Sequence, residues 1–315
     1  MKTLFPGRRR AALIGLAALA LATIIQSRRA DAADRNDQLN VGGQVRTFGI
    51  HIPDASPPPG GFPVILTFHG GGGQGAAMRR LTGFDAFADS RGFIAVYPDG
   101  IGRHWNDGRK TIHDSQDDVG FVVALLDWLQ VNARVDRSRI FAAGLSNGAL
   151  FAERLGCDLS GHIAAIAAVA GTLPVDTARA CNPTRSVAVL QIAGVSDPIM
   201  PYGGGKVADF GGRGEGGTVL SVARTAELWR QRNGCGSPGT EELLRPTAPL
   251  DPTQIAEMVA SGCPPAGPVR VISVIGAGHT WPGGPQYAPV ALVGRTSRQF
   301  SASRVIVDFF LALPP

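Results

Sequence analysis

Short apolar runs alternate with longer helix-compatible segments along most of this chain. The helix-compatible segments have lengths and compositions typical of helices that pack against a sheet. The apolar runs, typical of buried strands, are Val64–Phe68, Phe93–Tyr97, Ile140–Ala143, Ile163–Val169, Val187–Ala193 and Val269–Ile275. The helical segments are Val119–Val131, Leu220–Arg232 and Ala302–Leu311. Because this alternation is typical of α/β proteins, it predicts one α/β domain with a mostly parallel central sheet and helices on both faces.

The first 32 residues have the composition of an export signal. Lys2 and Arg8–Arg10 precede the apolar stretch Ala11–Ile25, and Ala30–Ala32 offers a small-residue cleavage site. The apolar stretch is short for a membrane span, so we expect cleavage rather than anchoring. The prediction is a signal peptide over 1–32, a folded domain over 33–315, and a secreted protein, extracellular or periplasmic. The adjacent arginines fit either a twin-arginine or an ordinary secretory route.

The charge balance changes once this leader is set aside. The chain has 30 basic and 25 acidic residues, but six of the basic residues and one acidic residue lie in the leader, which leaves 24 of each. No basic block remains that would favour nucleic acid or a membrane surface. We expect neither as a partner.

The four cysteines are an even number in a chain predicted to enter an oxidising compartment. Three pairings are open, and we favour Cys157 with Cys181 and Cys235 with Cys263, because sequence neighbours would then clamp two local excursions. Free buried thiols are the alternative. No cysteine or histidine cluster suggests a metal.

The pentapeptide Gly144–Gly148 contains the sequence Gly-Leu-Ser-Asn-Gly between an apolar run and a helix-compatible segment. A strand, a sharp turn and a helix in this order are typical of a nucleophile elbow, which exposes a serine hydroxyl and leaves room only for tiny residues two positions away. The pattern predicts Ser146 as a nucleophile.

Two residues in later loops are suited to activate that serine. Asp197 follows the apolar run Val187–Ala193, and His279 follows Val269–Ile275. Serine hydrolases of this architecture have the chain order serine, acid, histidine. His162, the other histidine after Ser146, is expected at the surface. We therefore predict Asp197 and His279 as orienting acid and base.

An oxyanion formed at this site needs backbone donors. The strand Val64–Phe68 leads into His69 and four glycines, where the backbone can approach a substrate closely. We predict the N–H groups of Gly71 and Asn147 as the donors. His69 is expected to brace the loop rather than transfer protons.

A dinucleotide site is the main competing interpretation of the same loop. Gly70, Gly72 and Gly75 form the spacing G-x-G-x-x-G after a strand, and Asp99 follows the next strand. An exported protein meets little NAD, so we expect no cofactor.

Asp117 and Asp118 are expected to cap a helix rather than to form a catalytic pair. The glycine-rich segment 203–217 is either a mobile loop near the site or a tolerated insertion.

These motifs together resemble the secreted polyhydroxybutyrate depolymerase and feruloyl esterase family of α/β-hydrolases. The resemblance runs from about Gln44 to Leu313 and rests on the glycine loop, the serine pentapeptide, the two later loops and three further segments. These segments are Tyr97–Gly100, Trp105–Asn106 and Asp117–Phe121. The resemblance implies an α/β-hydrolase fold and a Ser146, Asp197, His279 triad with Gly71 and Asn147 as oxyanion donors.

The resemblance also suggests the substrate class. It implies a serine esterase acting on polyhydroxybutyrate-type oligomers or on feruloyl or acetyl esters of plant polysaccharide. Trp281 resembles an aromatic wall for such a substrate, with a packed core indole as the alternative, and Trp105 is a second candidate ring platform. We expect no extra substrate-binding domain of the kind used on solid polyester. An acyltransferase and a non-catalytic binding protein are the two other classes compatible with the sequence.

Overall fold

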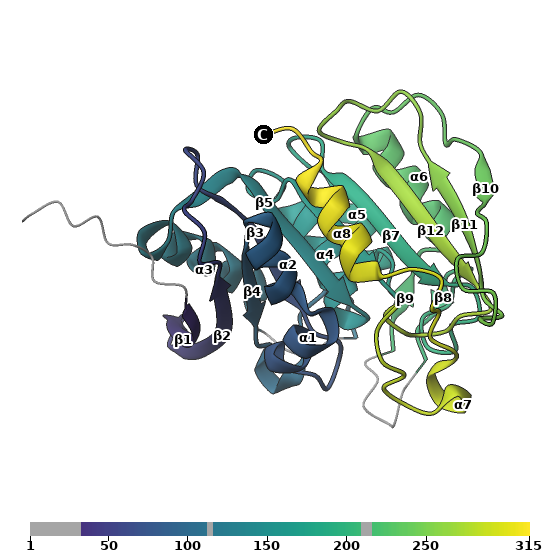
Figure 1. Ribbon diagram of the computed structural model, residues 1–315, viewed down its shortest axis with the longest axis horizontal. Helices are drawn as coiled ribbons and strands as arrows, with labels where there is room; N and C mark the ends of the chain where they lie inside the picture. Colours follow the sequence, from purple (N-terminus) through teal and green to yellow (C-terminus); the bar gives the residue numbers. More distant parts are fainter. Residues whose placement is uncertain (1–32, 112–115, 209–215) are drawn as a thin grey trace, which may run out of the picture.

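A computed structural model describes residues 33–111, 116–208 and 216–315 (Figure 1). The predicted signal peptide over 1–32 lies outside the described residues, as does the middle of the predicted loop 203–217. Two short strands pair with each other here: β8 (Gly205–Lys206) lies in that loop, and β9 (Thr218–Val219) begins directly after it.

The main sheet of the described chain has ten strands in the order β1-β2-β4-β3-β5-β6-β7-β12-β11-β10. The six central strands, from β4 to β12, pair in parallel, and antiparallel strands extend both edges. The strands are β1 (Ala33–Val41), β2 (Gln44–Ile52), β3 (Phe62–Phe68), β4 (Ile94–Pro98), β5 (Val135–Leu145), β6 (Ala165–Val169), β7 (Ala188–Gly194), β10 (Glu241–Leu243), β11 (Gln254–Val259) and β12 (Val269–Ile275). The predicted parallel centre is confirmed.

Helices cover both faces of this sheet. Figure 1 shows α2 and α8 in front of the strands, whereas α3, α4 and α6 lie behind them. The helical segments are α1 (Gly75–Thr82), α2 (Phe84–Arg91), η1 (Ile101–Arg103), α3 (Asp118–Asn132), α4 (Asn147–Asp158), α5 (Val175–Ala180), α6 (Val222–Arg232), α7 (Val290–Val293) and α8 (Ala302–Leu311). The three predicted helices correspond to α3, α6 and α8.

Each central strand is buried on both faces, which is why the strands appear in the sequence as continuous apolar runs. In β3, Val64, Leu66 and Phe68 join the core beneath α3, α4 and α6, while Ile65 joins the core beneath α2 and α8. β5 begins five residues earlier than its apolar run. Four of these five residues are polar and none is buried, so the start of the strand carries no apolar signal. Apolar pattern alone could not locate that end.

Both predicted cysteine pairs are disulfides in the structure. Cys157 at the end of α4 bonds to Cys181 after α5, and Cys235 bonds to Cys263. Each bond closes a loop between neighbours in sequence, with separations of 24 and 28 residues. Loops of this length contribute about 3 to 4 kcal/mol in the chain-entropy account of cross-linking.

The two acidic residues expected to cap α3 have different roles. Asp117 is the N-cap, and its carboxylate accepts from the N–H of Gly120 at 2.7 Å. Asp118 is instead almost fully buried, pairs with Arg46 at 2.6 Å and accepts from the N–H of Asn106. The capping prediction was wrong for Asp118, because its side chain turns into the protein toward a buried arginine.

A buried carboxylate links the helix after Ser146 to two other elements. Glu153 of α4 is 0 % exposed and accepts from Trp229 Nε1 of α6 at 2.6 Å and from Gln191 Nε2 of β7 at 3.2 Å. Burial raises the pKa of Glu153 to about 7, against the opposing effect of these two donors. In the described chain, the buried Oε1 of Gln191 has no partner.

This raised pKa predicts how stability depends on pH. The folded state holds a proton on Glu153 that the unfolded state releases above its ordinary pKa, so the wild-type protein loses stability as pH rises toward about 7. Glu153→Gln removes that loss and can donate to the unpaired Gln191 oxygen. We expect the variant to gain unfolding free energy relative to wild type between pH 5 and pH 8, measured by urea denaturation.

Glu241→Gln is the matched control, because it removes the carboxylate of an exposed residue. A stability difference between Glu153→Gln and wild type that is the same at both pH values would contradict the prediction.

Candidate active site

The segments predicted to carry chemistry all follow the carboxyl ends of parallel strands. The glycine loop follows β3, Ser146 follows β5, Asp197 follows β7 and His279 follows β12. Strand registers align these ends, since Phe68 pairs with Gly144 and Gly194 pairs with Val274. Parallel strands therefore deliver all four segments to one edge of the sheet, where open α/β sheets bind their ligands.

Ser146 sits in a strained turn between β5 and α4. Its backbone has φ 56° and ψ −123°, a conformation that L-residues rarely adopt, and its N–H donates to the carbonyl of Val169 at 3.0 Å. A Cβ on Gly144 would collide with the carbonyl of Gly148, and a Cβ on Gly148 would collide with that of Phe68. The turn has the geometry predicted for a nucleophile elbow, and Ser146 is partly exposed between buried neighbours.

His279 and Asp197 form a buried hydrogen-bonded pair. His279 Nδ1 lies 2.8 Å from Asp197 Oδ2, and the two side chains are 4 % and 2 % exposed. The other carboxylate oxygen accepts the N–H groups of Ile199 and Met200, each at 2.8 Å. Since a carboxylate only accepts, His279 Nδ1 donates in this hydrogen bond, and Nε2 is the ring nitrogen left for a second partner.

The loops on either side hold this pair in place. Ser196 N–H donates to the carbonyl of Ala277 at 3.0 Å, which ties the Asp197 loop to the His279 loop. The backbone of His279 donates to Val293 O at 2.6 Å, and its carbonyl accepts from the Tyr287 hydroxyl at 2.6 Å. His279 is therefore fixed by its own backbone as well as by its ring.

The glycine loop lies directly beside Ser146. A Cβ built on Gly70 would stand 3.3 Å from the Cβ of Ser146. In the described chain, neither Gly71 N–H nor Asn147 N–H donates to a protein acceptor. The two predicted oxyanion donors therefore belong to segments that meet at the serine.

His69 braces the loop, as expected. Its Nδ1 donates to the carbonyl of Gly70 at 2.8 Å, and its Nε2 accepts from the N–H of Gly100 at 3.0 Å. Burial lowers the pKa of His69 and favours the neutral ring that this pair of contacts requires.

Both tryptophans predicted as substrate platforms lie in the core instead. Trp281 is 1 % exposed, and its Nε1 donates to Ser303 Oγ at 3.0 Å. Trp105 is 0 % exposed and stacks on Phe151 with ring centroids 5.2 Å apart. Since neither indole presents a face to solvent, the prediction that they form a substrate wall was wrong.

Asp99 hydrogen-bonds to two neighbouring elements of the fold. Its Oδ1 accepts from the N–H of Gly75 and its Oδ2 from Thr47 Oγ1, both at 2.8 Å. The carboxylate thereby ties the end of β4 to the start of α1 and to β2. His162 is exposed, as predicted.

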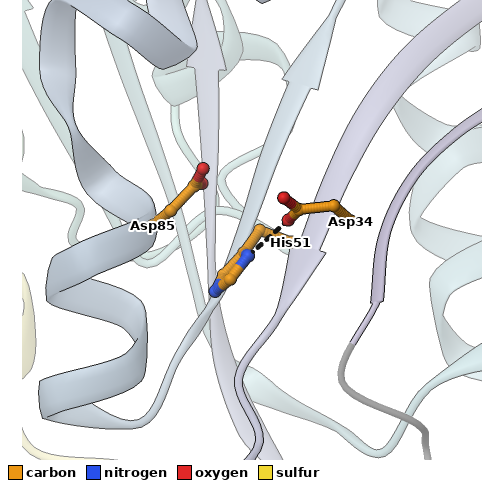
Figure 2. A group of neighbouring side chains, drawn as sticks. All are labelled: Asp34, His51 and Asp85. Atoms are coloured by element: carbon orange, nitrogen blue, oxygen red, sulfur yellow. Dashed lines mark hydrogen bonds and ion pairs between the residues drawn. The ribbon is translucent and has the colours of Figure 1, made fainter.

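Figure 2 shows a second group of titratable side chains, Asp34, His51 and Asp85, at the junction of β1, β2 and α2. Arg79 pairs with both carboxylates, and the ring nitrogens of His51 contact Asp34 at 2.6 Å and Asp89 at 2.8 Å. Burial opposes protonation, but the hydrogen bonds to the two carboxylates raise the pKa of His51. Arg79 and His51 already pair with these three acids, so the group is an ion-pair network that fastens β1.

Sequence reasoning missed the polar residues behind the serine. Asp107 and Arg109 form an ion pair at 2.7 Å with side chains 0 % and 4 % exposed. The carboxylate also accepts from the side chain of Asn147 at 2.8 Å. No sequence motif predicts such an ion pair. The one indication in the sequence was the family-like segment Trp105–Asn106, which directly precedes Asp107.

Known proteins similar to this chain are esterases. "Putative esterase NocK" of Nocardia uniformis subsp. tsuyamanensis is 34% identical over 293 residues, which cover 90% of this chain and 84% of that protein. "Feruloyl esterase B" of Piromyces equi is 29% identical over 180 residues, 55% of this chain and a third (33%) of that protein. No protein-family model matches.

The chain belongs to the polyhydroxybutyrate depolymerase and feruloyl esterase family of α/β-hydrolases. It is a carboxylic ester hydrolase. The fold of this esterase also matches the solved acetyl xylan esterase from Aspergillus awamori, with a TM-score of 0.61 at 13% identity over 88% of this chain and 99% of that one. In the described part of the esterase, no helix is long and apolar enough to cross a bilayer.

The Asp197–His279 bond predicts a large effect of a small substitution. Asp197→Asn keeps an oxygen for the N–H groups of Ile199 and Met200 but favours the wrong imidazole tautomer. We expect kcat to fall about ten-thousand-fold, as in other triads, with the fold intact. Ester hydrolysis and circular dichroism measure the two quantities.

Asp136→Asn is the matched control. Asp136 also accepts a backbone N–H two residues on, at 2.9 Å, but lies at the opposite end of β5. A comparable loss of kcat in both variants would mean that Asp197 has no special role.

Proposed function

We propose that this esterase hydrolyses carboxylic esters through an acyl-enzyme, with Ser146 as nucleophile, His279 as general base and Asp197 as its orienting acid. The observation that carries the proposal is the buried His279–Asp197 hydrogen bond at the sheet edge that also holds the strained, partly exposed Ser146. Strain in that turn is compatible with a role in presenting the hydroxyl.

The reaction follows from these roles. His279 Nε2 takes the hydroxyl proton while Ser146 Oγ bonds to the ester carbonyl carbon, and the carbonyl oxygen becomes an oxyanion. The imidazolium then gives its proton to the leaving alkoxide, the carbon–oxygen bond breaks and an acyl-serine remains. A water deprotonated by His279 then attacks the acyl carbon. The bond from that carbon to Ser146 Oγ breaks, His279 returns its proton to the serine oxygen, and the acid is released.

The oxyanion is the charge that the site must stabilise. We assign the N–H groups of Gly71 and Asn147 to it. The positive end of the α4 dipole lies at the same point, since this helix begins at Asn147. Fixed donors aimed at a developing charge contribute the largest electrostatic part of such catalysis.

The substrate class follows from the relatives' names and one accessible ring. The named relatives include a feruloyl esterase and an acetyl xylan esterase. Tyr287 is 47% exposed, and its hydroxyl is held by the carbonyl of His279. We therefore propose feruloyl or acetyl esters of plant polysaccharide as substrates, with Tyr287 in contact with an aromatic acyl group, and soluble 3-hydroxybutyrate oligomers as the competing substrate.

The site of action is proposed from the leader and the disulfides. The predicted signal peptide and the two disulfide bonds both favour a compartment outside the cytosol.

The nucleophile is tested by substitution and by labelling. Ser146→Ala should lose essentially all turnover and all reaction with a fluorophosphonate, because the attacking oxygen is gone while the strand and helix remain. Ser138→Ala, at an exposed position in the first half of β5, is the matched control. Turnover near the wild-type rate in Ser146→Ala would refute the mechanism.

The substrate is tested by comparing kcat/KM for methyl ferulate, 4-nitrophenyl acetate and a soluble 3-hydroxybutyrate oligomer. We expect methyl ferulate to be preferred to the oligomer. Tyr287→Leu should lower kcat/KM for the ferulate more than for the acetate, because only the aromatic acyl group contacts the ring. Equal loss on both esters would exclude a contact specific to the aromatic acyl group. Preference for the oligomer would indicate a depolymerase of soluble polyester.

A further inference from the structure

The segment Arg103–Arg109, which begins at the last residue of η1, contacts both segments assigned to the oxyanion. On the glycine loop, Arg103 O accepts from Gly72 N–H at 2.9 Å. The ring of His104 lies over the same loop, with Nε2 2.7 Å from the place that a Cβ on Gly71 would occupy. Any side chain at Gly71 would therefore displace this ring.

Trp105 joins the two donors more directly. Its indole Nε1 donates to the carbonyl of His69 at 3.0 Å, two residues before Gly71. Its backbone N–H donates to Asn147 Oδ1 at 2.8 Å, and its carbonyl accepts from Asn147 Nδ2 at 2.9 Å. One residue thus holds the glycine loop with its side chain and Asn147 with its backbone.

The remaining hydrogen of the Asn147 amide goes to Asp107. Asn147 Nδ2 donates to Asp107 Oδ2 at 2.8 Å, so both amide hydrogens and the amide oxygen are engaged. This set of partners admits one orientation of the amide, since the carbonyl and the carboxylate accept and the Trp105 N–H donates. The residue whose backbone N–H faces the oxyanion cannot rotate without breaking three buried bonds.

Asp107 is itself fixed on several sides. Arg109 contacts both carboxylate oxygens through Nε at 3.0 Å, and Arg109 N–H donates to Oδ1 at 3.1 Å. The Asp107 carbonyl accepts from Thr177 Oγ1 at 2.9 Å. A carboxylate that is 0 % exposed and bound by a guanidinium is a rigid acceptor.

We propose that Trp105 and Asp107 are positioning residues that set the separation of the two oxyanion donors, Gly71 N–H and Asn147 N–H. The inference rests on the proposed function and extends it to residues that contact no substrate. Displacing a donor by a fraction of an ångström weakens its bond to the oxyanion more than to the neutral ester, because the charge develops only in the transition state. The expected signature is a lower kcat with an unchanged KM.

Two variants test the proposal. Both leave the two donor N–H groups in place, because these groups belong to the backbone. Trp105→Phe removes only the indole N–H and keeps a ring to stack on Phe151. Asn147→Ala removes the three amide contacts but keeps the N–H. We expect each to lower kcat by about ten-fold with KM within about two-fold of wild type, a fraction of the loss seen when a donor is deleted outright.

A trifluoromethyl ketone provides a readout that a purely structural role would not move. Its adduct with the serine places an oxyanion between the two donors, so its inhibition constant should rise by the same factor by which kcat/KM falls. Trp229→Phe is the matched control, because it removes a buried indole N–H that donates at 2.6 Å to Glu153 on the far side of α4. It should lower the melting temperature without changing kcat or the inhibition constant.

Each outcome decides the proposal. A proportional change in kcat/KM and in inhibition for Trp105→Phe and Asn147→Ala, absent in Trp229→Phe, supports positioning. An unchanged kcat, a changed kcat with unchanged inhibition, or an equal loss of kcat in Trp229→Phe overturns it. Ser146→Ala is measured in parallel to test the proposed function separately. If activity depends on Ser146, the proposed mechanism stands even when the positioning proposal is overturned.

Discussion

The left-handed turn at Ser146 is the constraint on which the rest of this site depends. A serine at φ 56° is unfavourable by about 1 to 3 kcal/mol and persists only where its surroundings impose it. Here β5 is paired on both sides and α4 packs back on the sheet so closely that Gly144 and Gly148 have no room for a side chain. The partly exposed hydroxyl is thus held by one of the most buried parts of the protein.

The loops around the serine are held in place for a related reason. Each projects from a strand end, where mobility would be expected, but each is bound by hydrogen bonds that are shielded from water. The Asp197 loop is tied to the His279 loop, and the glycine loop and Asn147 are tied to the segment Arg103–Arg109. Buried polar networks that are fully paired favour one arrangement, since each alternative leaves a donor or acceptor unpaired in a medium of low dielectric.

The position of the aromatic residues separates structural roles from substrate contact. Trp105 and Trp281 adjoin functional segments in the sequence, yet both indoles are buried and use their N–H groups inside the protein. The Tyr287 hydroxyl donates to the carbonyl of His279, and the rest of its side chain is about half exposed. Large apolar rings next to a site are most often part of its support, and exposure distinguishes them from rings that can meet a ligand.

The sequence by itself determined the buried parallel strands, the elbow at Ser146, and the order of the loops with Asp197 and His279. These features are local: apolar runs, glycines where no Cβ fits, and polar residues just after strands. It also favoured the two disulfides, since both join sequence neighbours. The tertiary structure alone decided that Asp118 faces Arg46, that both indoles are buried, and that Asp107 holds Asn147 across 40 residues. Those roles depend on which segments the sheet order brings together, and no spacing along the chain encodes a contact between a loop and a helix that meet only after folding.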